Sequence, residues 1–139
     1  KQTWVGGVCI RNNEVLLIHR INRDNDFVKE FFMFPGKEVQ DDENIEDALR
    51  NAFEDFSVTV QVDELLYAKE DDTDENEYFY ICRHALGEPH IAKESDEAKK
   101  MEDGRQVFTP MWVSLRELDD LIVYPESVKM KLLEALQEE

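Results

Sequence analysis

Residues 34–58 read FPGKEVQDDENIEDALRNAFEDFSV, a Pro-Gly turn and an acidic loop followed by an amphipathic helix. At about 100° of rotation per residue, one face of this helix carries the polar positions 47, 50, 51, 54 and 55. The opposite face carries Ala48, Leu49, Ala52, Phe53 and Phe56. We therefore predict a helix that packs through one face and leaves the other face available for chemistry.

The polar face has two interpretations. In the first it is an ordinary solvated surface, on which Arg50 and Glu54 form an i,i+4 ion pair that contributes roughly a few tenths of a kcal/mol. In the second it binds a divalent cation, because carboxylates three and four residues apart point the same way and hard cations prefer oxygen ligands. The order of the residues favours the second interpretation.

That order resembles the signature box of the Nudix hydrolases, G-x5-E-x7-R-E-U-x-E-E-x-G-U, in which U is a bulky apolar residue. The positions that match outright are Gly36, Arg50, Glu54 and Val58. Asp42 and Asp55 keep the carboxylate of the box on a shorter side chain. Asn51 and Ser57 differ from the box, because they stand where it has Glu and Gly. The chain thus carries a degenerate form of the box.

The acidic loop permits a second register. Its sequence PGKEVQDDE aligns without gaps with the loop PGGxVExGE that is usual in the family, which makes Glu43 the first acid instead of Asp42. The two halves of the box then agree only if one residue is missing between the loop and the helix. Lys37 follows Gly36 where the family has a run of glycines. The first acid is therefore either Asp42 or Glu43.

The resemblance implies a metal-dependent hydrolase that cleaves a phosphoanhydride bond in a nucleoside diphosphate linked to another group. Mg²⁺, or alternatively Mn²⁺, would be held by the Gly36 carbonyl, Asn51, Glu54 and Asp55. Arg50 would orient the carboxylates through charge-assisted hydrogen bonds. Glu54, or an acid from the later loops, would serve as the base. The resemblance implies a small phosphoanhydride substrate, which we expect to be a nucleotide.

Two other classes of function remain open. Asn51, the short side chain of Asp55 and the reduced glycine turn also suit a Nudix-fold module that binds a nucleotide or a protein partner with weak turnover or none. An acidic interaction domain unrelated to the family would leave the ordered matches to coincidence. A screen of phosphoanhydride substrates separates these alternatives.

The composition is that of one globular domain, which we expect to span residues 1–139. Hydrophobic residues make up 42% and charged residues 35% of the chain, which is enough apolar material for a continuous core. The net charge of −17 argues against binding to nucleic-acid polymers or anionic membranes, which such a protein repels. No signal peptide or spanning segment is visible, so we expect a cytoplasmic location.

The rest of the chain predicts strands and helices in an irregular order. The predicted strands span 3–10, 14–19, 31–34, 58–67, 78–84 and 106–113, with a hairpin turn at 11–13. Polar loops are predicted at 21–30, 69–77 and 87–104. Ser114 and Glu117 have the spacing of a capping box, and Pro125 opens a terminal helix. This order predicts an α/β domain with a mixed sheet, which the resemblance sharpens to an α/β/α sandwich.

The remaining chemically distinctive residues have structural interpretations. Cys9 and Cys82 lie in apolar runs typical of strands, and we expect buried free thiols. The three histidines, His19, His84 and His90, show no metal or triad spacing. Among the aromatic residues 78–80, alternation along a strand places at least one in the core, although such rings could also stack on a base.

Overall fold

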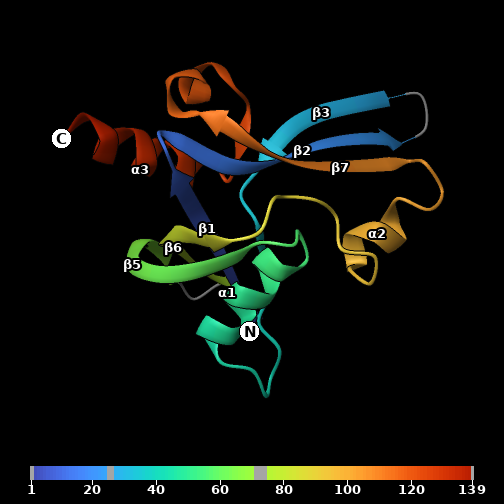
Figure 1. Ribbon diagram of the computed structural model, residues 1–139, viewed down its shortest axis with the longest axis horizontal. Helices are drawn as coiled ribbons and strands as arrows, with labels where there is room; N and C mark the ends of the chain where they lie inside the picture. The colour runs from blue at the N-terminus through green and yellow to red at the C-terminus, as the bar shows by residue number, and fades with distance from the viewer. Residues whose placement is uncertain (1, 25–26, 71–74, 139) are drawn as a thin grey trace.

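The computed structural model describes residues 2–24, 27–70 and 75–138 (Figure 1). Its central hairpin joins β1 (Gln2–Arg11) to β2 (Glu14–Asp24). Asn12 and Asn13 have φ angles of 49° and 63°, the left-handed conformation that a two-residue hairpin turn needs and that Asn tolerates. The two strands pair beside this turn, with Ile10 opposite Val15, and then diverge.

One half of the sheet is built on β1. It lies between β6 (Glu75–Leu86), which runs parallel to it, and the short strand β4 (Gly36–Glu38), which runs antiparallel. β5 (Thr59–Lys69) pairs with the outer side of β6 in the antiparallel sense. Parallel and antiparallel pairs therefore occur in one sheet, which confirms the predicted mixed sheet.

The other half is built on β2. This strand lies between β3 (Phe27–Met33) and β7 (Gln106–Ser114), and both neighbours run antiparallel to it. A two-residue strand, β8 (Val123–Tyr124), adds to β3 in parallel. Because β8 directly precedes the last helix, this pairing fixes where that helix begins.

Helices cover both faces of the sheet. They are α1 (Ile45–Glu54), α2 (Asp96–Lys100), the 3₁₀ helix η1 (Leu115–Asp120) and α3 (Glu126–Gln137). Alternate residues of β1 contribute to two separate cores: Val5 packs with Phe53 of α1, and Val8 packs with Leu132 of α3. Since successive strand residues point to opposite faces, α1 and α3 lie on opposite sides of the sheet. The expected α/β/α arrangement is confirmed (Figure 1).

The prediction of a polar loop at 21–30 is wrong for residues 21–24 and 27–30, and residues 25 and 26 lie outside the described part of the chain. β2 continues to Asp24 and β3 begins at Phe27, with Ile21 opposite Glu30 and Arg23 opposite Val28. β7 also pairs with this part of β2. Backbone hydrogen bonds on both sides hold the extension, which projects beyond the core, so its side chains are mostly polar and lack the apolar alternation of a buried strand.

Other differences concern the ends of elements. The strands predicted at 3–10, 58–67, 78–84 and 106–113 are present, and their ends are shifted by at most three residues. The short strands β4 and β8 were not predicted, and α2 lies within the predicted loop 87–104. The predicted loop 69–77 overlaps the ends of β5 and β6, and its residues 71–74 lie outside the described part of the chain. Within the described ranges, no helix is long and apolar enough to cross a membrane.

Candidate active site

The faces of α1 are as predicted. The helix starts at Asn44, whose side chain accepts a hydrogen bond from the Asp47 N–H at 2.8 Å, as a good N-cap does. The fully buried residues of the helix are Ala48, Leu49, Ala52 and Phe53. Glu54 is exposed, whereas Asn51 and Asp55 are half-buried. The polar face is therefore open to ligands along part of its length.

The C-terminal end of α1 keeps the backbone of the box without its glycine. The Val58 N–H donates to the Phe53 carbonyl at 3.1 Å, and the Ser57 N–H donates to the Glu54 carbonyl at 2.9 Å. This pair of bonds is a Schellman motif. Ser57 has a φ of 63°, the left-handed conformation that favours glycine. Ser57 therefore adopts the conformation that favours glycine, at the position where the box has glycine.

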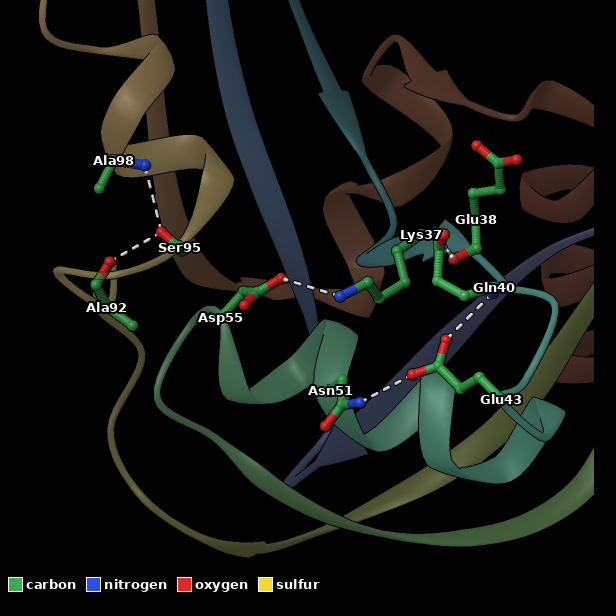
Figure 2. Close-up of polar contacts among 9 residues, drawn as sticks. All are labelled: Lys37, Glu38, Gln40, Glu43, Asn51, Asp55, Ala92, Ser95 and Ala98. Atoms are coloured by element: carbon green, nitrogen blue, oxygen red, sulfur yellow. Dashed lines mark hydrogen bonds and ion pairs between the residues drawn. The ribbon is translucent and has the colours of Figure 1, made fainter.

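The segment after β6 crosses this end of α1 and brings α2 beside it. The Ala92 N–H donates to the Asp55 carbonyl at 2.9 Å, and the His90 N–H donates to the Phe56 carbonyl at 3.1 Å. The buried Ser95 then caps α2, because its hydroxyl accepts from the Ala98 N–H at 3.1 Å (Figure 2). These contacts bring the acidic start of α2 close to the polar face of α1.

An acidic groove of about 500 Å³ lies between the loop and α1. Its lining includes Asp42, Glu43, Asp47, Arg50, Asn51 and Glu54. The Glu43 carboxylate accepts hydrogen bonds from the Gln40 N–H at 3.2 Å and from the Asn51 Nδ2 at 2.9 Å (Figure 2). Asp42 is exposed. Glu43 is therefore the loop acid that contacts the polar face of the helix, as in the second register.

Asp55 does not line this groove and faces Lys37. The Lys37 Nζ lies 3.9 Å from the Asp55 Oδ2, and the two side chains are 30% and 28% exposed (Figure 2). Burial raises the pKa of Asp55, the Lys37 ammonium lowers it, and the carboxylates of Glu97, Asp96 and Glu54 raise it further. Acids from α1 and α2 thus gather around one half-buried ion pair.

Arg50 does not make the predicted contacts with Glu54 or Asp55. Its guanidinium lies 3.1 Å from Glu46 Oε1 and 3.9 Å from Asp47 Oδ1. Helical side chains lean toward the N-terminus of their helix, so Arg50 reaches the acids of the first turn. The expected orienting role of Arg50 has no support in this arrangement, although the residue still lines the groove.

The predicted metal ligands are divided among three places. Asn51 and Glu54 line the groove, Asp55 faces Lys37, and Gly36 in β4 packs on the indole of Trp4. A Cβ at Gly36 would lie 2.7 Å from the Trp4 Nε1, which explains the glycine there. In the described ranges no three His, Cys, Asp or Glu residues converge on one point.

The donor chemistry of the groove nevertheless suits a hard cation. Glu43 and Glu54 bring carboxylates to its lining, and Asn51 brings a side-chain amide whose Nδ2 donates to Glu43. Mg²⁺ and Mn²⁺ prefer such ligands, and Mg²⁺ usually keeps several waters and binds one or two carboxylates together with substrate phosphates. The groove therefore fits a divalent ion by ligand type, whereas the Asp55 carboxylate already has the Lys37 ammonium beside it.

A second cavity, of about 410 Å³, was missed by the sequence analysis. Its aromatic walls include Trp4, Phe31, Phe34, Phe79 and Tyr124. Arg20, Glu75 and Glu77 bring charge to the lining. The rings of Phe31 and Tyr124 meet edge to face at 5.4 Å. These residues come from strands β1, β2, β3, β6 and β8 and the Phe34 turn, so their proximity depends on the topology.

The cysteines and the histidines His19 and His84 make structural contacts, as expected from the sequence. Cys9 and Cys82 are buried free thiols on neighbouring strands, and burial raises the pKa of each to about 12. His84 hydrogen-bonds to the Gly87 carbonyl at 2.6 Å, and His19 contacts Glu30 at 2.7 Å. Of residues 78–80, Phe79 is the one in the core.

A family model described as NUDIX domain matches residues 1–132. No curated protein sequence matches the chain. Among solved structures, it is similar to a NUDIX hydrolase from Nitrosomonas europaea, with a TM-score of 0.71 and 14% identity over 99% of this chain and 89% of that one. An ADP-ribose pyrophosphatase from Streptococcus suis has a TM-score of 0.64 and 17% identity over 96% and 90%. A MutT NUDIX hydrolase from Burkholderia pseudomallei has a TM-score of 0.60 and 20% identity over 94% and 95%.

Proposed function

The chain belongs to the Nudix hydrolase family, whose model spans residues 1–132, and on this premise we propose that it cleaves a phosphoanhydride bond in a nucleotide with the help of a divalent cation. The observation that carries the proposal is the acidic groove on the polar face of α1, which Glu43, Asn51 and Glu54 line together. Phe34 lines the aromatic pocket and Glu43 lines the acidic groove. The segment from Phe34 to Glu43 links the two linings along the chain, and we propose that the pocket takes a flat ring and the groove takes phosphates.

The groove is the phosphate end of this site. Glu43 and Glu54 would hold the ion, with the Asn51 side chain beside them, and Mg²⁺ or Mn²⁺ there would neutralise charge on the phosphate oxygens. Such help is needed because the protein carries a net charge of −17, which repels a polyanionic substrate. Glu54, exposed in the groove, can also accept a proton from an attacking water.

The aromatic pocket is the recognition end. Stacking of a base on an aromatic side chain contributes about 1–3 kcal/mol by alanine substitution, and Trp4, Phe31 and Tyr124 offer such rings. Glu75 and Glu77 lie in the same lining, and their carboxylates can accept hydrogen bonds from the N–H groups of a base edge. These features favour a nucleotide over a substrate without a ring.

A panel of phosphoanhydride substrates tests this function. With Mg²⁺ and with Mn²⁺, the wild-type protein should release phosphate or pyrophosphate from at least one nucleotide. Glu54→Gln should abolish the release while its thermal melt stays at that of the wild type. Glu46→Gln is the matched control, because Glu46 is an exposed acid on the same helix that contacts Arg50 and does not line the groove.

Two results would count against the proposal. One is a folded wild-type protein that is inert toward every substrate and still binds a nucleotide, which would favour the binding module. The other is equal loss of activity in Glu46→Gln and Glu54→Gln, which would mean that the groove has no special part. Tyr124→Ala should separately raise the KM for a nucleotide, because Tyr124 is half exposed and one wall of the pocket.

A further inference from the structure

Lys37 stands at the box turn, where its side chain has a definite partner. It lies in β4 next to Gly36, and β4 is held to β1 by a register that places Lys37 opposite Val5. Its ammonium lies 3.9 Å from the Asp55 carboxylate, and both side chains are less than one third exposed. The contact is therefore a partly desolvated ion pair, at a separation longer than a hydrogen bond.

The partner is also fixed in position. Asp55 follows the last residue of α1, and its carbonyl accepts the Ala92 N–H at 2.9 Å. Asp96 and Glu97 at the start of α2 lie close enough to repel its charge. A nearby cation stabilises the negative charges of Asp55, Asp96 and Glu97, and the protein itself supplies one as the Lys37 ammonium. A divalent ion at the Asp55 carboxylate would have to share it with an ammonium, and like charges at this distance repel strongly.

The acidic groove differs from the surroundings of Asp55 in the positively charged side chain that lies nearby. Arg50 lines it, but the Arg50 guanidinium is engaged by Glu46 and Asp47. Glu43 is held toward the helix by Gln40 and Asn51, and Glu54 is exposed there. An ion can therefore enter the groove without displacing a lysine.

We infer that Lys37 occupies the cation position at Asp55, so that the site combines one built-in ammonium with a divalent ion confined to the Glu54 groove. The inference rests on the proposed function in placing that ion in the groove. It also gives Asp55 a role other than metal ligation, which is the role that the box implies. Asp55 would hold Lys37, and Lys37 would keep a second divalent ion away.

Binding of Mn²⁺ to the nucleotide-free protein tests this inference, measured by electron paramagnetic resonance and titration calorimetry. The wild type should bind one ion weakly, Glu54→Gln should remove this binding, and Asp55→Asn should leave it unchanged. Lys37→Gln should create an additional Mn²⁺ site, with an affinity at least about tenfold higher than that of the wild type. The reason is that the positive charge next to the Asp55 carboxylate is removed. The double change Lys37→Gln/Asp55→Asn should lose this gain.

Lys131→Gln is the control for overall charge, because it makes the same change in net charge at an exposed position of α3. Lys37→Met, which is also uncharged, should repeat the effect of Lys37→Gln, and thermal melts check that each variant is folded. The inference is overturned if Lys37→Gln binds Mn²⁺ no better than Lys131→Gln. It is equally overturned if Asp55→Asn weakens binding as much as Glu54→Gln does. A failure of the proposed function would show up differently, as missing hydrolysis.

Discussion

Ser57 shows how one residue can depart from a motif while the backbone keeps the motif's shape. Its φ of 63° and the two hydrogen bonds of the Schellman turn are those expected of a glycine. A side chain in the left-handed conformation costs roughly 1–2 kcal/mol. Nearby, a Cβ at Gly87 would lie 2.2 Å from the Ser57 carbonyl, so the two residues fix the close crossing of the chain over α1.

We predict that Ser57→Gly stabilises the protein by about 1 kcal/mol, because the strain of the left-handed conformation is relieved and the gain is partly offset by a more flexible unfolded chain. Urea unfolding measures the change. Ser127→Gly, at an exposed position in the first turn of α3, should instead lower stability. Equal effects of the two substitutions would show that Ser57 is not strained.

At the scale of single elements, α1 separates packing from chemistry. Phe53 is fully buried, and its ring lies against Gly7, where a Cβ would come within 2.4 Å of the Phe53 Cε2. The next residue, Glu54, lies about 100° around the helix, on the solvent side. The same ten residues therefore hold the core on one face and the groove on the other.

We predict that Phe53→Ala destabilises the protein by about 3–5 kcal/mol, because it leaves a cavity in a packed core. Glu54→Gln should change stability by less than about 0.5 kcal/mol, as exposed substitutions generally do, and should act on hydrolysis alone. Chemical unfolding of both variants provides the comparison. Comparable losses of stability in the two would mean that the assignment of the helix faces is wrong.

The faces of α1 could be predicted because burial follows the 3.6-residue period of a helix. The extension of β2 through Ile21 and Arg23 could not, because backbone pairing holds it on both sides without an apolar pattern. The partners of Arg50 and Lys37 depend on side-chain directions that spacing does not specify. The aromatic pocket could not be found because one wall, Tyr124, lies in the two-residue strand β8.

At the scale of the whole molecule, the dominant feature is the net negative charge. The chain has 33 acidic and 16 basic residues, so its field repels an anionic substrate before any contact forms. Salt weakens this field, since the Debye length falls to about 10 Å at 0.1 M. Association with the substrate should therefore be slowed by the protein's own charge.

We predict that kcat/KM for a nucleotide rises as monovalent salt increases from about 10 to 150 mM at constant free Mg²⁺, because screening removes long-range repulsion. Initial rates at low substrate concentration measure this dependence. A variant with two exposed acids of α3 neutralised, Glu126→Gln/Glu134→Gln, should show a shallower rise. A fall in kcat/KM throughout the range would show that local attraction outweighs the net charge.

The central claim is that the Glu54 groove is a hydrolytic centre, and Asn51 allows the most direct measurement. Asn51 stands where the box has Glu and lies in the groove, and an amide lacks the charge of a carboxylate. The decisive experiment compares turnover and Mn²⁺ affinity of the wild type, Asn51→Glu and Asn51→Glu/Glu54→Gln. We predict that Asn51→Glu tightens Mn²⁺ binding and raises turnover, and that the double variant loses both. Folded wild-type and Asn51→Glu proteins that bind a nucleotide and cleave nothing would contradict the claim.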